Sequence, residues 1–129
     1  YCKENGITFY AYMVLEQGAL SGKYDSAHPF PAVSDRANAY NPILPRLDAL
    51  LNKLRETGVS HSASVAQIAT AWAIAKGTLP IIGVTKAAQV EEAARAAAIS
   101  LTEQEAWELE ALADMANVST IRGWEKEMK

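Results

Sequence analysis

Cysteine and histidine are scarce in this chain. Cys2 is the only cysteine among 129 residues, and His28 and His61 are the only histidines. A single cysteine excludes a disulfide within the chain, and so few thiol and imidazole groups disfavour a Cys–His metal site. Because cysteine is not used for cross-links, the composition fits the reducing cytoplasm, which is the location we expect.

Long apolar runs and a basic excess are also absent. No stretch approaches the roughly 20 apolar residues that a membrane-spanning helix needs, and no signal-peptide pattern opens the chain. Twelve basic and fifteen acidic residues give a net charge of −3, whereas nucleic-acid-binding domains usually carry a basic excess. We therefore expect neither a membrane nor a nucleic acid as a partner.

The length and the content of apolar residues suit one folded domain over residues 1–129. Half of the residues are hydrophobic and 21% are charged, as in ordinary globular proteins. The chain starts at Tyr1 rather than at a methionine, and residues 1–6 resemble the end of a helix. We take this as a hint that the sequence continues a longer protein.

Two segments have the composition of strands. Residues 7–12 join β-branched and aromatic side chains after Gly6, and both faces are apolar, as in a buried parallel strand. Residues 79–84 form a second, shorter apolar run, with Pro80 near its start, where the missing N–H does least harm. We expect both segments to be strands, and the first of them to be buried.

Four helices are predicted around the second strand. Pro45 opens the first, which carries a leucine stripe and ends at Gly58. Ser64 and Thr102 begin two others through capping boxes with Gln67 and Glu105. Thr85 caps the remaining helix, over residues 85–98, and residues 117–129 have no clear period.

Strands that alternate with helices favour a parallel α/β sheet. Two strands do not make a stable sheet alone. The remaining strands must therefore come from sequence outside these 129 residues or from other chains.

The first strand leads into an irregular loop that extends to about Pro42 and contains Gly18, Gly22 and Lys23. Its glycine–lysine pattern is superficially that of a P-loop. Only three residues separate the glycines where four are needed, and Tyr24 replaces the required Ser or Thr. Lys23 and nearby backbone N–H groups either hold a phosphate or form a turn with a solvated lysine, and the local pattern leaves both readings open.

A second junction lies where Thr85 and Lys86 open a helix directly after a strand. Free N–H groups at a helix N-terminus attract anions, although a plain N-cap is the commoner meaning. Tyr12, at the end of the first strand, either stacks on a planar ring or packs in the interior. Two such junctions on successive strands favour a cofactor site.

Three motifs in series resemble those of the aldo-keto reductase family. Residues 12–24 resemble its aromatic-Ser-Pro-Leu segment followed by Gly and Gly-Lys-Tyr. Residues 64–69 with Trp72 resemble its Thr-Pro-Ala-Gln-Val-Ala helix, and residues 82–86 with Gln89 and Glu92 resemble its second cofactor motif. The order and spacing match over nearly the whole chain.

The resemblance implies the C-terminal part of a (β/α)8 TIM barrel, with strands seven and eight and their helices, in an enzyme that reduces aldehydes or ketones with NADPH. Tyr12 would stack on the nicotinamide, and Thr85 or Lys86 would lie near a 2′-phosphate. The implied cofactor-binding residues are Tyr12, Met13, Val14, Leu15, Glu16 and Gln17 on the nicotinamide and pyrophosphate, Lys23 and Arg36 on phosphate or ribose, and Gly83, Thr85, Lys86, Gln89, Glu92 and Ala93 at the adenosine end.

This sequence departs from the family pattern in three ways. Met13-Val14 replaces the usual Ser-Pro, so backbone contacts alone would remain there, and Ala93 stands where many members have an adenine-contacting Asn. The family's catalytic Asp, Tyr, Lys and His belong to earlier strands, so no residue here is assigned a catalytic role. We expect this chain to bind the cofactor without carrying out the reduction.

Several alternatives follow from the same resemblance. The chain is interpreted as the cofactor-binding portion of an enzyme for small carbonyl substrates, completed by the N-terminal half of the barrel or by self-association. Alternatively, it is a non-catalytic nicotinamide-binding or assembly module like the ion-channel β subunits that resemble this family. A third reading is an isolated inactive portion.

Overall fold

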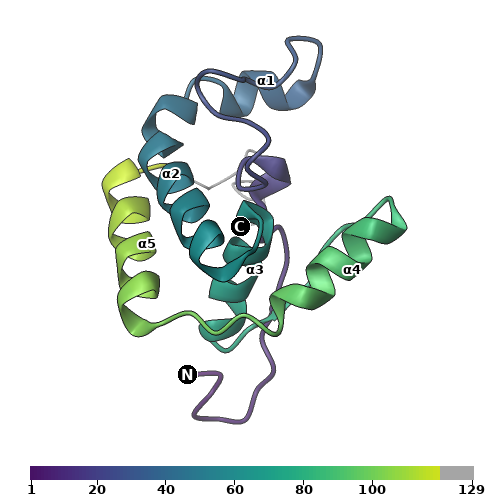
Figure 1. Ribbon diagram of the computed structural model, residues 1–129, viewed down its shortest axis with the longest axis vertical. Helices are drawn as coiled ribbons and strands as arrows, with labels where there is room; N and C mark the ends of the chain where they lie inside the picture. The colour runs from purple at the N-terminus through teal and green to yellow at the C-terminus, as the bar shows by residue number, and fades with distance from the viewer. Residues whose placement is uncertain (120–129) are drawn as a thin grey trace, which may run out of the picture.

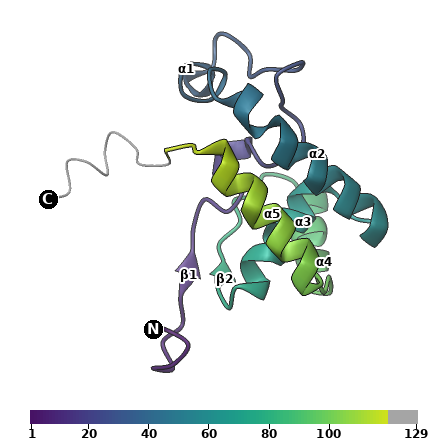
Figure 2. The same ribbon diagram turned by 90° about the vertical axis from the view of Figure 1, so that its left-hand side faces the viewer.

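Five α-helices dominate the regular structure of the described residues (Figure 1), and two short strands lie along one flank of them (Figure 2). The computed structural model describes residues 1–119. The rest of the predicted domain, including most of the predicted irregular tail, lies outside the described residues. In chain order the elements are β1 (Tyr10–Ala11), a 3₁₀ turn (Glu16–Gly18), α1 (Asp35–Tyr40), α2 (Leu44–His61), α3 (Val65–Ala75), β2 (Leu79–Pro80), α4 (Ala87–Ala96) and α5 (Glu103–Ala116).

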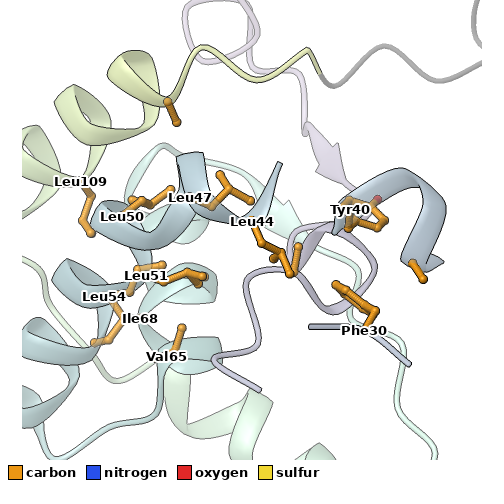
Figure 3. Close-up of a cluster of buried hydrophobic side chains, with 14 residues drawn as sticks. Phe30, Tyr40, Leu44, Leu47, Leu50, Leu51, Leu54, Val65, Ile68 and Leu109 are labelled. Carbon is orange, nitrogen blue, oxygen red and sulfur yellow. The ribbon is translucent and has the colours of Figure 1, made fainter. Parts of the chain in front are cut away.

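The core lies around α2, which packs against both α3 and α5. Leu47, Leu50, Leu51 and Leu54 of α2 are all buried, as the predicted stripe requires. Ile68 of α3 faces them and is completely buried. Figure 3 shows these side chains pointing toward one another, with Phe30 of the loop after β1 and Tyr40 of α1 at one end of the cluster.

Two of the helix starts confirm the predicted capping boxes. Ser64 Oγ accepts from the Gln67 N–H, and Thr102 Oγ1 accepts from the Glu105 N–H. The predicted end of α2 at Gly58 is wrong. That helix continues to His61 and stops at Ser62, which adopts the left-handed conformation with φ of 51°.

The start of α4 also differs from the prediction. Lys86, not Thr85, is the N-cap residue, and the helix runs from Ala87 to Ala96 instead of to residue 98. On α5, Trp107 is 63% exposed. The buried face of α5 is instead carried by Leu109 and Ala116, which meet α2.

β1 and β2 pair in parallel, as predicted, with Tyr10 opposite Leu79 and Ala11 opposite Pro80. Each strand is only two residues long, so the predicted spans of residues 7–12 and 79–84 are too long. The backbone remains extended on either side, and the Ile81 N–H donates to the Ala11 carbonyl at 2.8 Å. Among the described residues each strand has one neighbouring strand, so regular pairing is limited to the two residue pairs that lie opposite each other.

The expected burial of the first strand is also wrong for this chain, and the second strand is exposed as well. Phe9, Tyr10 and Leu79 are each at least half exposed. Figure 2 shows β1 beside β2, with no further element beyond β1 among residues 1–119. The sequence is that of interior strands, whereas the described chain covers only part of their surface.

Helix α1 was not predicted, and it interrupts the expected irregular loop. Ser34 Oγ caps it by accepting from the Arg36 N–H. Its buried residues are Ala37 and Tyr40, three positions apart. A six-residue helix with two inward-facing residues is too short to produce a recognisable period.

Candidate functional site

The loops that follow β1 and β2 meet over the N-terminal half of α3 and enclose a pocket of about 160 Å³. Leu15 and Ser21 come from the first loop, and Gly83 comes from the second. Gln67 and Thr70 of α3 form the floor, and α4 supplies Gln89, Glu92 and Ala93. The two predicted junctions therefore contribute to one site.

The pocket collects five of the fourteen predicted cofactor residues, namely Leu15, Gly83, Gln89, Glu92 and Ala93. Thr85 and Lys86 lie beside it at the start of α4, with exposed side chains. Tyr12 and Val14 instead line a larger groove on another side of β1. Ser21, Gln67 and Thr70 were missed, because polar residues that line a pocket across elements leave no local sequence signal.

The loop after β1 has an unusual backbone. Met13, Glu16 and Gln17 all have positive φ, at 57°, 44° and 53°. The Glu16 N–H donates to the Met13 carbonyl at 2.7 Å, and the Gly18 N–H donates to the Leu15 carbonyl at 2.8 Å. The segment is thus a tight turn, and these two N–H groups are already used within it.

Gly22 packs tightly against α3. A Cβ atom at this position would lie 2.7 Å from Cβ of Val65, and its φ is +79°. The neighbouring Lys23 is exposed, with its ammonium 5.3 Å from the centre of the Tyr24 ring. Close packing explains this glycine fully, so it gives no separate support for a phosphate loop.

Two side chains of α1 contact the strained turn. The Arg36 Nη1 donates to the Gln17 carbonyl at 2.9 Å, and the Tyr40 hydroxyl donates to Glu16 Oε1 at 2.9 Å. Arg36 therefore lies against the first loop, where its guanidinium contacts the protein backbone.

Gln89 folds back over the start of its own helix. Its Oε1 accepts from the Thr85 N–H at 2.8 Å and from the Lys86 N–H at 3.0 Å. Both backbone donors at this helix start are therefore satisfied within the chain. Any anion at this end would be attracted chiefly by the exposed Lys86 ammonium.

Glu92 joins α4 to α3. Its carboxylate accepts a hydrogen bond from Ser64 Oγ, and its backbone carbonyl accepts from Gln67 Nε2 at 2.9 Å. The residue is half-buried at the wall of the pocket. Its position is thus fixed by the cap of α3, a contact that the local pattern did not predict.

The larger groove has a volume of about 630 Å³ and lies between β1, α2, α3 and α5. Its lining is mostly apolar and includes Phe9, Leu50 and Trp72. At its rim Glu110 accepts from Lys76 Nζ at 3.1 Å and from Trp72 Nε1 at 3.0 Å. Two hydrogen bonds lower the pKa of the Glu110 carboxyl. The bond from Lys76 has the larger effect and the bond from Trp72 the smaller one.

Neither histidine lines the pocket or the groove. His28 lies 3.0 Å from Asp25 on the surface, whereas His61 is half-buried and lies 2.9 Å from Glu105. Within residues 1–119, no cluster of three potential metal ligands occurs, and none of the helices is long and apolar enough to cross a membrane.

Comparison with known proteins gives consistent results along the chain. The sequence profile of the Aldo/keto reductase family matches residues 1–114. A chloroplastic pyridoxal reductase from Arabidopsis thaliana is 36% identical over 121 residues, which are 94% of this chain and 33% of that protein. The aldo-keto reductase str7 from Strobilurus tenacellus is 30% identical over 126 residues, covering 90% of this chain and 36% of its own length.

A solved structure has the same fold. The glycerol dehydrogenase AKR11B4 from Gluconobacter oxydans superposes with a TM-score of 0.76 at 21% identity, over 95% of this chain and 39% of that protein. The chain thus spans about a third of the length of the curated relatives it matches. The two strands and five α-helices of residues 1–119 correspond to part of a larger fold.

Proposed function

Because the chain belongs to the aldo/keto reductase family, we propose that it is the C-terminal cofactor-binding portion, with strands seven and eight, of an oxidoreductase that reduces aldehydes or ketones with NADPH. The observation that carries the proposal is the pocket where the loops after β1 and β2 meet. In barrel enzymes the loops at the carboxyl ends of neighbouring strands form the active site.

The residues at the pocket fit one end of a dinucleotide. At about 160 Å³ the pocket is smaller than the roughly 300–1,000 Å³ typical of whole ligand sites. It suits the adenosine end, with Gly83, Gln89 and Glu92 around it and the exposed Lys86 beside it to attract a 2′-phosphate. The nicotinamide end would extend along the first loop toward Tyr12.

The bound cofactor would supply a hydride to the substrate carbonyl. The residues of this chain would bind and orient it, with Lys86 supplying charge. Hydride transfer also needs a proton donor beside the carbonyl, and the family's donor has no counterpart in this sequence. We therefore expect no oxidation of NADPH when the 129-residue chain is mixed with an aldehyde, and measurable turnover would contradict this part of the proposal.

A charge reversal at Lys86 tests the cofactor assignment. Calorimetric titrations of wild type and Lys86→Glu with NADPH and with NADH give four affinities. We expect the substitution to weaken NADPH by about tenfold or more and NADH much less, because only NADPH carries the 2′-phosphate.

Arg95→Glu is the matched control, since it makes the same charge change at the other end of α4. Among residues 1–119, Arg95 forms one ion pair, with Glu91 across an exposed turn at 3.6 Å. Equal losses for the two cofactors with Lys86→Glu, or equal losses for the two variants, would contradict a 2′-phosphate contact.

The exposed strands and the apolar groove are the surfaces on which the remainder of a barrel would pack. Ala11 of β1 and Phe9, directly before β1, line the groove, and Tyr10 lies 59% exposed between them. A strand beside β1 and a helix in the groove would cover both. Self-association of this chain is the competing outcome.

The non-catalytic alternative is favoured by one observation, the replacement of the usual Ser-Pro by Met13-Val14. Met13 adopts a left-handed conformation with φ of 57°. A nicotinamide-binding module would bind NADPH with the same Lys86 dependence, yet the complete protein would not reduce carbonyl compounds. The location that we propose is the cytoplasm, and fractionation of cells followed by immunodetection tests it.

A further inference from the structure

We propose that Arg36 and Tyr40, which project from α1 onto the turn after β1, are positioning residues that hold this turn in a strained conformation before any cofactor arrives. The family resemblance instead implies that Arg36 contacts the phosphate or ribose. The inference rests on the proposed function only for its effect on cofactor affinity. The contacts of Arg36 and Tyr40 with the turn, which we call the brace, are present in the ligand-free chain.

The turn has a conformation that its residues do not favour. Glu16 and Gln17 lie in succession at φ of 44° and 53°, followed by Gly18 at 102°. Residues with a Cβ rarely adopt positive φ, and two in succession are rarer still. Such backbone persists only where the surrounding structure holds it.

Each strained residue is held by one side chain of α1. The Arg36 guanidinium donates to the carbonyl oxygen of Gln17 at 2.9 Å. The Tyr40 hydroxyl donates to the carboxylate of Glu16 at 2.9 Å. Arg36 and Tyr40 are four positions apart, so both reach the turn from the same face of one short helix.

α1 is itself well anchored. Tyr40 is 6% exposed, and its ring centre lies 5.5 Å from that of Phe30. Asn41, directly after the helix, accepts from the Phe30 N–H at 2.9 Å and donates to the Phe30 carbonyl at 3.0 Å. The helix is therefore a fixed base against which the turn is held.

This arrangement has a consequence for binding. A loop that is already ordered loses less conformational entropy when it closes on a ligand. Arg36 would thus raise the affinity for NADPH through the backbone of Gln17, without touching the cofactor. The same holds for Tyr40 acting through Glu16.

Amide hydrogen exchange of the ligand-free chain tests the brace directly. The N–H groups of Gly18, Ala19 and Leu20 donate to Leu15 and Glu16 carbonyls within the turn, at 2.8, 3.0 and 3.1 Å, so their exchange reports its opening. We expect Arg36→Ala and Tyr40→Phe each to speed exchange at these amides by about tenfold. Exchange in α5 should stay as in wild type, and Arg95→Ala is the control.

A second substitution separates the brace from a general loss of stability. Gln17→Gly removes the strain, because glycine adopts this φ freely. In the Arg36→Ala background it should restore slow exchange at Gly18, Ala19 and Leu20, and with it the affinity for NADPH. A variant that had merely lost folding stability would not be rescued by this change.

Three results would overturn the proposal. The first is exchange at the three amides that stays within about twofold of wild type in Arg36→Ala. The second is faster exchange that extends equally to α5. The third is a loss of NADPH affinity without any change in exchange and without rescue by Gln17→Gly, which would make Arg36 a direct phosphate contact. Absence of NADPH binding in wild type would count against the proposed function and leave the exchange result valid.

Discussion

At the scale of single residues, the glycine–lysine pair after β1 has a structural explanation. Gly22 permits the loop to approach α3 so closely that a Cβ would lie 2.7 Å from Cβ of Val65. Lys23 lies against the Tyr24 ring. The pattern that first indicated a phosphate loop therefore reflects packing, and the cation beside the pocket is Lys86.

A pair of glycine substitutions separates backbone strain from crowding. Gly22 and Gly77 have nearly the same φ, +79° and +80°, but nothing lies within 4 Å of a Cβ at Gly77. We expect Gly77→Ala to lower the free energy of unfolding by about 1 kcal/mol. Gly22→Ala should lower it by a further 1–3 kcal/mol, approximately, because of the clash with Val65. Urea denaturation measures both, and equal losses would contradict the packing role.

Individual site residues could be predicted only where a motif identified them. Gly83, Gln89 and Glu92 belong to a recognisable series, and all three line the pocket. The contact of Arg36 with a backbone carbonyl nineteen positions earlier could not be predicted, because it depends on a helix that has no sequence period. A motif indicates which part of the fold a residue belongs to, but it does not identify the group to which its side chain is hydrogen-bonded.

At the scale of elements, α3 and α4 are joined by the cap of α3. Ser64 contacts the Gln67 backbone within its capping box and also donates to the Glu92 carboxylate. α4 otherwise extends away from α2 and α5 (Figure 1). The cap therefore fixes the helix that carries Lys86.

Ser64 and Thr102 both cap helices, so substitutions at these two positions provide a matched test of this junction. Thr102→Ala removes a capping box of the same kind and should lower the free energy of unfolding by about 1 kcal/mol. Ser64→Ala should lower it by about 2 kcal/mol, since it also leaves the half-buried Glu92 carboxylate without its serine donor. Thermal or urea unfolding gives the comparison. If the two losses are equal, Ser64 contributes no more than an ordinary cap.

The hydrogen bonds of Glu105 at the start of α5 make the free energy of unfolding depend on pH. The Thr102 backbone N–H, together with His61, lowers the pKa of the Glu105 carboxyl. A carboxyl with a lowered folded-state pKa stabilises the fold above its ordinary pKa, and this contribution is lost as the pH falls through the lowered value. We expect the free energy of unfolding of Glu105→Gln to fall less between neutral and acidic pH than that of wild type. The exposed Glu103→Gln should leave that loss unchanged, and equal behaviour of the two variants would contradict the assignment.

The elements themselves were largely predictable from the sequence. The capping boxes at Ser64 and Thr102 and the leucine stripe of α2 depend on neighbours in the chain, and they were identified correctly. The end of α2 was not predicted correctly. The helix stops at Ser62, which has φ of 51°, and not at Gly58. The strands were predicted too long, because their length depends on partners that local sequence does not specify.

At the scale of the whole molecule, apolar strand surfaces are left uncovered. Tyr10 and Ile81 are 59% and 56% exposed, although their sequence context is that of interior strands. Exposed strand edges of this kind pair readily with other chains. The composition of the strands thus agrees with a surface that is buried in a larger assembly.

Light scattering of the chain in solution tests this. We expect a mass above the 13.9 kDa of one chain that rises with concentration. Tyr10→Lys should shift the distribution toward the monomer, because a charge on an edge strand opposes pairing. Val59→Lys, at an 82% exposed position of α2, is the control. A stable monomer at all concentrations would contradict an uncovered barrel surface.

We propose that two loops, one after each strand, hold one NADPH. The most direct test is a titration of the isotopically labelled chain with NADPH, followed through its backbone amide signals by NMR. We expect saturable shifts concentrated in residues 13–17 and 83–89, with the signals of α5 unchanged. Shifts confined to the groove between β1 and α5, or no saturable shift at all, would contradict the account.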